Sequence, residues 1–386
     1  MHDSASLAVG AVLGAGATLC AVCALGRWQP HPSPPSEIAD GLLGLIGNTP
    51  LVRIRSLSEA TGCEILAKAE FLNPGGSIKD RVAKSILQRA IATSGLPPGG
   101  LIAEGTSGST GVSLALVAAA LGRRAFVALP SDAAAEKAAT LRALGAEVAE
   151  VPPVGISHPE HFVHVARRMA DEAGGAFADQ FETGANWRTH YETTAEEIWQ
   201  QAGGRVDAFV SGSGTGGTIA GVGRRLKELS EDVKVVLVDP PGSGLFAKVT
   251  RGVMYAPEEA EGQRRRNPND IITEGVGLNR LTANFAQASI DAAFQCSDRE
   301  AVEMAAYLVR NDGLWVGSSS ALNCVGAVKA ARRLRAQAGP EGRRPVVVTV
   351  LCDGGHRHLS KFYSPGVLRE AGLVPRETGA SLAFVS

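Results

Sequence analysis

Residues 73–81, with the sequence NPGGSIKDR, combine a proline–glycine turn with a lysine that opens a helical pattern. Ser77 is the expected N-cap, and Asp80 follows three residues later in the spacing of a capping box. Lys79 therefore falls in the first helical turn, where the positive end of the helix dipole disfavours an ammonium group. An amine destabilised in this way is more often neutral and nucleophilic, which suits Schiff-base chemistry.

Two further loops carry groups that bind anions. Residues 106–111 (TSGSTG) place hydroxyls and flexible backbone before an Ala/Leu-rich helix that we expect to begin near Val112. Residues 211–218 (SGSGTGGT) follow a predicted strand and precede a helical pattern through Ile219. Backbone N–H groups at the start of a helix bind carboxylates and phosphates, so the first loop predicts a carboxylate or phosphate cradle and the second a phosphate site.

The second loop also permits another interpretation. Gly212, Gly214 and Gly217 match the G-x-G-x-x-G fingerprint, and Asp239 lies 22 residues beyond Gly217 at the end of the next predicted strand. Such a loop with an acidic residue at that distance is typical of dinucleotide-binding sites. A nicotinamide-dependent dehydrogenase is therefore the rival hypothesis, although it leaves the lysine segment unexplained.

Alternating strand and helix patterns supply the elements that must position these loops. Short apolar runs, rich in β-branched residues and separated by helical stretches such as 133–143, predict strands at 126–130, 148–151, 206–210, 233–238 and 345–351. This alternation predicts an α/β fold whose parallel sheet is covered on both faces. Ligands bind such sheets at the carboxyl ends of the strands, where the glycine-rich loops stand.

Composition limits the possible functions. The 386 residues suggest two domains or one large α/β unit, and 45% hydrophobic content excludes a disordered chain. The 38 basic and 39 acidic residues leave a net charge of −1, which gives no electrostatic case for nucleic-acid binding.

Six cysteines are too few for a disulfide scaffold in a chain of this length. Cys20 and Cys23 have C-x-x-C spacing but lie in an apolar run without partner ligands, so we expect no metal site. The four other cysteines are expected to be reduced and buried: Cys63, Cys296, Cys324 and Cys352.

The N-terminus is predicted to be a separate unit. Residues 4–26 carry no charge, and as a helix they would span about 34 Å, enough to cross a membrane. Arg27 follows directly, which places the C-terminal side in the cytosol by the positive-inside rule. We expect a membrane anchor at 1–27 and a proline-rich linker at 28–37, with a disordered apolar tail as the alternative.

Taken together, the loops and several further motifs resemble the cysteine synthase / cystathionine β-synthase family of fold-type II pyridoxal-phosphate enzymes. The resemblance runs in order over about residues 40–365, and its further motifs are 46–52 (IGNTPLV), 67–70 (AKAE), 180–182 (QFE), 191–194 (YETT) and 196–199 (EEIW). The chain most resembles the fungal membrane-associated cysteine synthase-like proteins through its hydrophobic N-terminus, 274–280 (EGVGLNR) and 357–361 (RHLSK).

The resemblance implies two doubly wound α/β domains of the tryptophan synthase β type, in addition to the N-terminal hydrophobic helix. The large domain would comprise 38–75 and 187–386, and the small mobile domain 76–186, with the cofactor between them. The resemblance also implies a homodimer and an anchor in the mitochondrial outer membrane, and the positive-inside rule puts the catalytic domain on the cytosolic side.

The resemblance also implies residue roles and a reaction. Lys79 would hold pyridoxal 5′-phosphate covalently and move the substrate α-proton. The cofactor phosphate would be bound by Gly214, Thr215, Gly216, Gly217 and Thr218. The substrate α-carboxylate would be bound by Thr106, Ser107, Thr110 and Gln180.

The implied reaction is β-replacement by a transferase or lyase. An activated serine such as O-acetylserine would lose its leaving group and accept a sulfur nucleophile, giving cysteine or a related thio-amino acid. The alternatives are a catalytically weak cofactor-binding relative acting at a membrane, and a lyase of the cysteine desulfhydrase or serine dehydratase type.

Two positions depart from the family pattern. Ser109 stands where the family has an asparagine that contacts the cofactor 3′-oxygen, and Gly354 stands where it has a serine that contacts the pyridine nitrogen. Glycine cannot make the second bond, and losing one neutral hydrogen bond costs about 1 kcal/mol. We therefore expect cofactor binding to survive through the phosphate loop and the covalent lysine.

Overall fold

The computed structural model describes residues 38–106, 108–133, 135–255, 271–376 and 381–386. Residues from Asp40 to Ser386 form one compact unit. The predicted anchor, the linker, Cys20 and Cys23 lie outside the described residues, as does Ser107.

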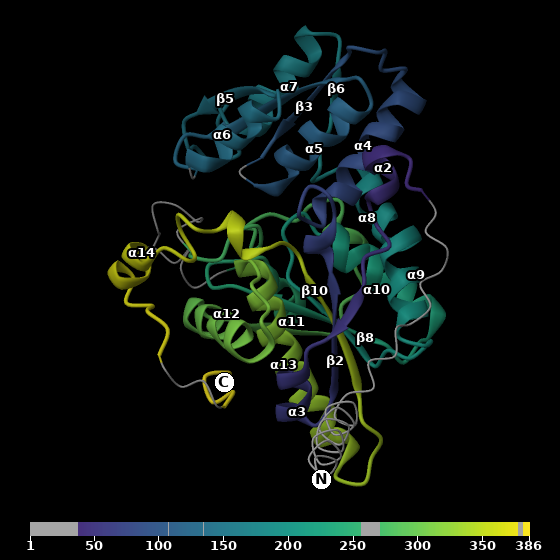
Figure 1. The fold of residues 1–386 in the computed structure, drawn as a ribbon, viewed down its shortest axis with the longest axis vertical. Coiled ribbons are helices and arrows are strands. Elements are labelled where there is room, and N and C mark those ends of the chain that lie inside the picture. The colour runs from purple at the N-terminus through teal and green to yellow at the C-terminus, as the bar shows by residue number, and fades with distance from the viewer. Residues whose placement is uncertain (1–37, 107, 134, 256–270, 377–380) are drawn as a thin grey trace, which may run out of the picture. The chain divides into compact units, whose positions relative to one another are not determined.

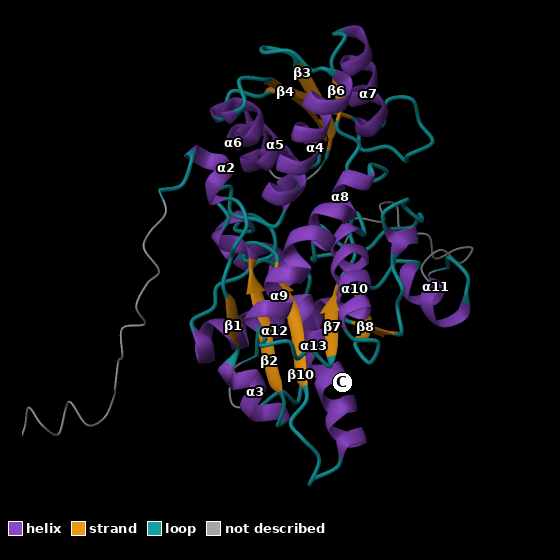
Figure 2. Cartoon of the chain, turned by 90° about the vertical axis from the view of Figure 1, so that its right-hand side faces the viewer, coloured by secondary structure: helices purple, strands orange, loops and turns teal. Residues whose placement is uncertain are grey.

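Six strands form the first sheet, in the order β1–β2–β10–β7–β8–β9 (Figures 1 and 2). Their bounds are β1 Leu51–Arg53, β2 Glu64–Ala69, β7 Ala208–Ser211, β8 Lys234–Asp239, β9 Ala292–Gln295 and β10 Val346–Leu351. Every pair is parallel except β1 with β2, which is antiparallel. The predicted parallel sheet is confirmed, and the antiparallel edge strand is an addition that the sequence pattern did not indicate.

Four strands form a second, wholly parallel sheet, in the order β5–β4–β3–β6. Their bounds are β3 Leu101–Gly105, β4 Arg124–Pro130, β5 Glu147–Val151 and β6 Ala176–Phe177. All five strands predicted from the sequence occur in the two sheets, with bounds within two residues of those expected.

Helices connect most of the strands along the described chain. They are α2 Gly41–Leu45, α3 Arg55–Thr61, α4 Lys79–Ser94, α5 Ser109–Ala120, α6 Ala135–Ala143, α7 Phe162–Glu172, α8 Gly184–Thr189, α9 Ala195–Gln201, α10 Gly217–Leu229, α11 Leu245–Arg251, α12 Asp298–Asp312, α13 Ser318–Ala338 and α14 Pro365–Glu370. Helices α8 and α9 follow one another without a strand between them, as do α12 and α13. Short 3-10 turns lie at Glu70–Leu72, Phe285–Gln287 and Gly355–Arg357, and one π-helical turn, η2, at His190–Thr194.

Strand β10 shows how the six-stranded sheet is covered on both faces. Val347 and Leu351 pack into a cluster with α12 and α13, whereas Val346, Val348 and Val350 pack on the opposite face with α9 and α10. Alternate residues of a strand point to opposite faces, so a run of β-branched residues is what a strand buried on both sides requires.

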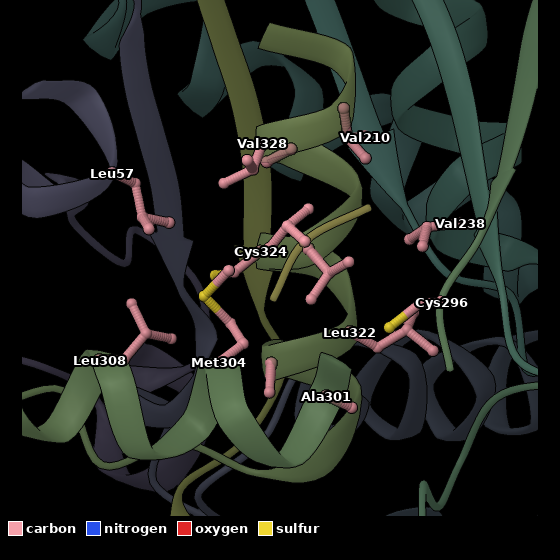
Figure 3. Close-up of a cluster of buried hydrophobic side chains, with 14 of the residues drawn as sticks. Leu57, Val210, Val238, Cys296, Ala301, Met304, Leu308, Leu322, Cys324 and Val328 are labelled. Carbon is pink, nitrogen blue, oxygen red and sulfur yellow. The ribbon is translucent and has the colours of Figure 1, made fainter. Parts of the chain in front are cut away.

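Figure 3 shows the core beneath α12 and α13. Met304 and Leu308 of α12 face Cys324 and Val328 of α13, with Leu57 of α3 beside them. The Cys324 thiol is free and fully buried. Cys63 and Cys296 are also free and buried, as expected, whereas Cys352 is free but only half-buried.

Candidate active site

Lys79 is the first residue of α4, and its side chain is half-buried. The Ser77 hydroxyl accepts the Lys79 N–H at 3.3 Å, but the expected capping box is wrong, because the Asp80 side chain does not return a bond to Ser77. The Asp80 carboxylate instead accepts hydrogen bonds from the Gly75 N–H and the Ser113 hydroxyl, both at 2.5 Å. A Cβ on Gly75 would lie 2.4 Å from Asp80 Oδ1, so this carboxylate fills the space that the glycine leaves and fastens the turn to the helix.

The Lys79 ammonium has no hydrogen bond or ion pair with any residue in the described part of the chain. Burial lowers the pKa of Lys79, and the neighbouring Cys352 and Asp353 oppose that shift only in part. A larger share of the side chain is therefore neutral than in a free lysine. An unpaired amine with a lowered pKa is available for covalent chemistry.

The lysine turn is fastened to the carboxyl end of β10. The Ile78 N–H donates to the Cys352 carbonyl at 2.9 Å, and Ser77 and Asp353 form an antiparallel bridge. Strand β10 lies at the centre of the six-stranded sheet. The backbone around Lys79 is thus held by one of the two central strands of this sheet.

Gly354 follows directly and is buried. A Cβ placed on it would lie 2.8 Å from both Nδ1 and Cε1 of His356. The imidazole edge therefore occupies the space beside Gly354 that a larger residue would fill.

The loop at 212–216 connects β7 to α10, as the sequence predicts. Its glycines are required by close backbone approaches. A Cβ on Gly214 would lie 2.2 Å from the Gly275 carbonyl oxygen, and a Cβ on Gly217 would lie 1.9 Å from Asn186 Oδ1. Gly216 has φ of 88°, in the left-handed region that favours glycine.

This loop fits a phosphate group. It leads into the N-terminus of α10, where the first backbone N–H groups have no partner within the helix. The Ser213 hydroxyl is fully buried and has no hydrogen-bond partner among the described residues. Thr215 is buried and its hydroxyl accepts Asn186 Nδ2 at 2.9 Å, and Thr218 is half-buried with its hydroxyl 3.4 Å from His190 Nε2.

Asp239 does not serve a dinucleotide. Its side chain is fully buried, and Oδ2 accepts the backbone N–H of Phe246 at 2.7 Å, near the start of α11. Burial raises the pKa of Asp239 to about 7. A carboxylate enclosed under a helix cannot bind the ribose of a ligand. Asp239, the acidic residue that the dehydrogenase hypothesis requires, therefore supports the start of α11 instead.

The hydroxyl loop leads directly into α5, which begins at Ser109, three residues before the expected start at Val112. Short polar residues are tolerated in a first helical turn because the N–H groups there have no intrahelical partner. Thr106 is buried and accepts the Gly108 N–H at 3.2 Å, and Ser109 is half-buried. The Thr110 hydroxyl donates to Gln180 Oε1 at 2.6 Å, which joins two of the predicted carboxylate-binding residues.

Gln180 also connects this loop to the phosphate loop. Its backbone carbonyl accepts Nδ2 of Asn186 at 2.7 Å and Nδ2 of Asn284 at 3.1 Å. Asn186 Nδ2 also donates to the Thr215 hydroxyl at 2.9 Å. Sequence reasoning missed both asparagines, because nothing in their local patterns marks them.

Glu104, at the end of β3, is a third residue that sequence reasoning missed. Its Oε2 accepts the Gln180 backbone N–H at 3.1 Å, and its Oε1 is buried without a partner among the described residues. Burial raises the pKa of Glu104 to about 8, so the carboxyl is mostly neutral at pH 7. An acidic residue inside the apolar run 101–105 was the signal that could have found it.

A buried cluster of ion pairs surrounds Arg81, two residues after Lys79. Arg81 binds Glu70 through two hydrogen bonds of 2.8 Å, and it binds Glu197 through two of 2.6 and 2.7 Å. Lys68, which is fully buried, contacts Glu197 at 2.6 Å. Three of the motifs noted in the sequence therefore contribute to one set of paired charges: 67–70, 73–81 and 196–199.

No helix within the described ranges is long and apolar enough to cross a membrane. The same residues contain no group of three or more His, Cys, Asp or Glu side chains arranged to hold a metal ion.

Comparison with known proteins identifies the family. Residues 42–353 match the pyridoxal-phosphate dependent enzymes. The chain is 51% identical over 361 residues to cysteine synthase 2 of Schizosaccharomyces pombe, covering 90% of this chain and 89% of that protein. It is 49% identical over 336 residues to the putative mitochondrial cysteine synthase of Saccharomyces cerevisiae, covering 84% of each.

The solved structure of O-ureido-L-serine synthase matches with a TM-score of 0.73 and 32% identity, covering 86% of this chain and 96% of that one. These matches rule out the dehydrogenase interpretation. The chain is a mixed α/β enzyme that uses pyridoxal 5′-phosphate, and it belongs to the cysteine synthase branch of the pyridoxal-phosphate-dependent family.

Proposed function

We propose that the chain makes cysteine by β-replacement, exchanging the leaving group of an activated serine such as O-acetylserine for a sulfur nucleophile. The observation that carries this proposal is Lys79, an unpaired amine held by a central strand at the start of α4. The curated relatives named cysteine synthase support the same reaction. Bound pyridoxal phosphate supplies the electron sink that makes the substrate α-proton removable.

Lys79 would hold the cofactor through Nζ and then carry the α-proton as base and acid. The phosphate would bind at the start of α10, through the residues Gly214, Thr215, Gly216, Gly217 and Thr218. The substrate carboxylate would bind at the start of α5, through Thr106, Ser107, Thr110 and Gln180. Because Gln180 hydrogen-bonds Thr110 and, through Asn186, Thr215, one residue would fix the spacing between substrate and phosphate.

We propose a large domain of 38–75 and 187–386 and a small mobile domain of 76–186, each doubly wound. The distribution of strands supports this division. The four-stranded sheet lies wholly within 101–177, and the strands of the six-stranded sheet lie at 51–69 and 208–351. Movement of the small domain would exclude water from the substrate.

We also propose that residues 4–26 anchor the enzyme in a membrane, with 28–37 as a linker and the catalytic unit in the cytosol as a homodimer. The uncharged run supports the anchor. The relative named putative mitochondrial cysteine synthase supports a mitochondrial site, for which we propose the outer membrane.

The test of the function is single-turnover chemistry with the purified chain. Wild-type enzyme should show a visible absorbance band from bound cofactor, a change in that band on adding O-acetylserine, and release of cysteine on adding sulfide. A band without turnover on O-acetylserine, O-phosphoserine or serine would instead identify a catalytically weak relative. Release of pyruvate without any cysteine would identify a lyase.

Gly217→Ala should weaken cofactor binding. The new Cβ would lie 1.9 Å from Asn186 Oδ1, and Asn186 cannot retreat without losing its bonds to Gln180 and Thr215. We expect the dissociation constant for pyridoxal phosphate to rise at least about tenfold, the cost of one lost loop hydrogen bond. Gly155→Ala is the control, because a Cβ there meets nothing within 4 Å. Equal affinities in the two variants, measured by fluorescence titration, would contradict the assignment of this loop.

His356 provides a second prediction. We propose that the ring beside Gly354 takes the place of the family's serine against the pyridine nitrogen, while Ser109 reaches the 3′-oxygen. His356→Ala should then shift the cofactor absorbance maximum and lower kcat about tenfold. The double variant Gly354→Ser/His356→Ala, in which the clash at 2.8 Å is absent, should recover both. If His356→Ala changes neither property, the ring has no role toward the cofactor.

A further inference from the structure

Four side chains of alternating charge form a series of contacts from α6 to the segment that pairs with the Lys79 turn. They are Lys137, Glu274, His358 and Asp353. Lys137 Nζ contacts Glu274 Oε1 at 2.8 Å, and Glu274 Oε2 contacts His358 Nδ1 at 3.2 Å. His358 Nε2 contacts Asp353 Oδ2 at 3.0 Å. Ionised carboxylates only accept hydrogen bonds, so both ring nitrogens must carry a proton and the ring is an imidazolium.

The ionisation of this set agrees with its geometry. Burial disfavours the charged ring, but Asp353 and Glu274 raise the pKa of His358 to about 9. Burial likewise disfavours the charged form of Glu274, but His358 and Lys137 lower its pKa to about 2. At neutral pH the set therefore alternates positive and negative from Lys137 to Asp353.

Asp353, at one end of the set, lies in the segment that pairs with the turn before Lys79. Asp353 forms a bridge with Ser77, and its carbonyl accepts the Gly317 N–H at 3.0 Å. A Cβ on Gly317 would lie 2.0 Å from Asp353 Oδ1 and 2.5 Å from His358 Nε2. The Asp353–His358 pair is thus packed against backbone on the side away from Glu274, and it holds the strand end that anchors the lysine turn.

The other end lies on the four-stranded part of the fold. Lys137 belongs to α6, which packs beside β5. Glu274 is fixed to α13 by its backbone N–H, which donates to the Ser318 hydroxyl at 2.9 Å. It also precedes Gly275, whose carbonyl oxygen would be 2.2 Å from a Cβ on Gly214 in the phosphate loop. The Lys137–Glu274 pair therefore joins a helix of one sheet to the groups that surround Lys79.

We propose that Lys137, Glu274 and His358 form a positioning relay that couples the closing of α6 over the substrate to the geometry of Lys79. This rests on the proposed function, in which the small domain moves, while the backbone contacts of Ser77 and Ile78 with Asp353 and Cys352 keep the Lys79 turn on β10. When α6 approaches, Lys137 completes the pairing of Glu274, and His358 stays protonated between two carboxylates. None of the three is a catalytic residue; each acts through the position of Lys79 or of α6.

The first experiment is kinetic and has a matched control. Lys137→Met removes a pair of 2.8 Å in which Lys137 is 20% exposed, and Lys227→Met removes a pair of 2.8 Å with Asp291 in which Lys227 is 21% exposed. We expect kcat/KM for cysteine formation to fall about fivefold in Lys137→Met and to stay within about twofold of wild type in Lys227→Met. The melting temperature should be the same in both. Equal kcat/KM values in active enzymes would overturn the relay, whereas an inactive wild type would overturn the proposed function.

The second experiment needs no reaction. Hydrogen exchange of the amides of α6 in cofactor-free protein should become faster in Lys137→Met and in Glu274→Gln, but not in Lys227→Met. Both relay variants remove a charge from the same contact, so exchange that is unchanged in either of them would overturn the coupling to α6.

The third experiment concerns pH. The groups that face His358 are Asp353 and Glu274, with Lys137 beyond Glu274 and Arg357 beyond Asp353. Because folding raises the pKa of His358 from 6.5 to about 9, its contribution to stability is complete below pH 6.5 and is lost as pH rises through about 9. The melting temperature of the cofactor-free wild type should fall across this window, and that of His358→Gln should fall much less. Identical pH curves for the two proteins would contradict the imidazolium.

Discussion

Replacing Lys79 by alanine should abolish cysteine formation while the protein stays folded. The side chain would be both the covalent attachment point of the cofactor and the carrier of the α-proton, so kcat should fall by at least about 10³-fold. Borohydride treatment should fix the cofactor to the peptide containing Lys79 in the wild type, and mass spectrometry should find no such adduct in Lys79→Ala. The visible band of the bound cofactor should disappear or move.

The fold should tolerate this change because the ammonium has no partner among the described residues and lies at the positive end of α4. The melting temperature should therefore be equal to that of the wild type or slightly higher. Lys84→Ala is the control on the same helix, where the lysine donates to the Leu43 carbonyl at 2.9 Å and lies away from the turn. Substantial turnover in Lys79→Ala would refute the central assignment of the site.

Two adjacent glutamates should differ sharply in their effect on stability. Glu197→Ala should lower the free energy of unfolding by about 3–5 kcal/mol, because it leaves the fully buried Lys68 without its carboxylate and removes one of the two carboxylates that pair with Arg81. Glu196→Ala should cost less than about 1 kcal/mol, because Glu196 and its partner Arg225 are each about one-third exposed. The measurement is the midpoint of urea unfolding near neutral pH.

Acid should reduce the difference between the two variants. Burial would raise the pKa of Glu197, but Arg81 and Lys68 lower it below 4.5. Its contribution is therefore complete above pH 4.5 and is lost as pH falls through the lowered pKa. Equal urea midpoints for the two variants at pH 7 would mean that the buried cluster stabilises the fold no more than a surface pair.

Local features of the fold could be predicted because their causes are local. A buried parallel strand requires a short run of β-branched residues, and such runs located the observed strands β4, β5, β7, β8 and β10 to within two residues. Glycine loops between strand and helix likewise placed the start of α10. The three-residue strand β1 was too short to give a pattern, so its antiparallel pairing with β2 was not foreseen.

The site itself was only partly readable. Asn186 and Asn284 both donate to the backbone carbonyl of Gln180, which lies 6 and 104 residues before them in the chain. Every residue has a backbone carbonyl, so the residue types cannot reveal such a hydrogen bond. Asp239 shows the opposite error. Its spacing fits a dinucleotide site, but spacing does not say that the carboxylate turns inward to the Phe246 N–H.

The start of α4 gave a third lesson. Ser77 and Asp80 have the residue types of a capping box, yet the two glycines before them let the backbone of Gly75 approach the Asp80 carboxylate first. The Asp80 carboxylate is thus occupied by the local Gly75 N–H and by the distant Ser113 hydroxyl, and the residue types alone did not distinguish this arrangement from a capping box.

The pairing of β2 with β10 also determines the order in which the chain can fold during synthesis. Glu64–Ala69 of β2 lies against Val346–Leu351 of β10, so the centre of the six-stranded sheet must wait until the chain through Leu351 has left the ribosome. The four-stranded sheet uses only neighbouring segments between Leu101 and Phe177, so its loops close early. The bond from the Ile78 N–H to the Cys352 carbonyl forms only with β10 in place. A nascent chain therefore has its reactive lysine long before it has the pocket for it, and stable capture of the cofactor is a late step of biosynthesis.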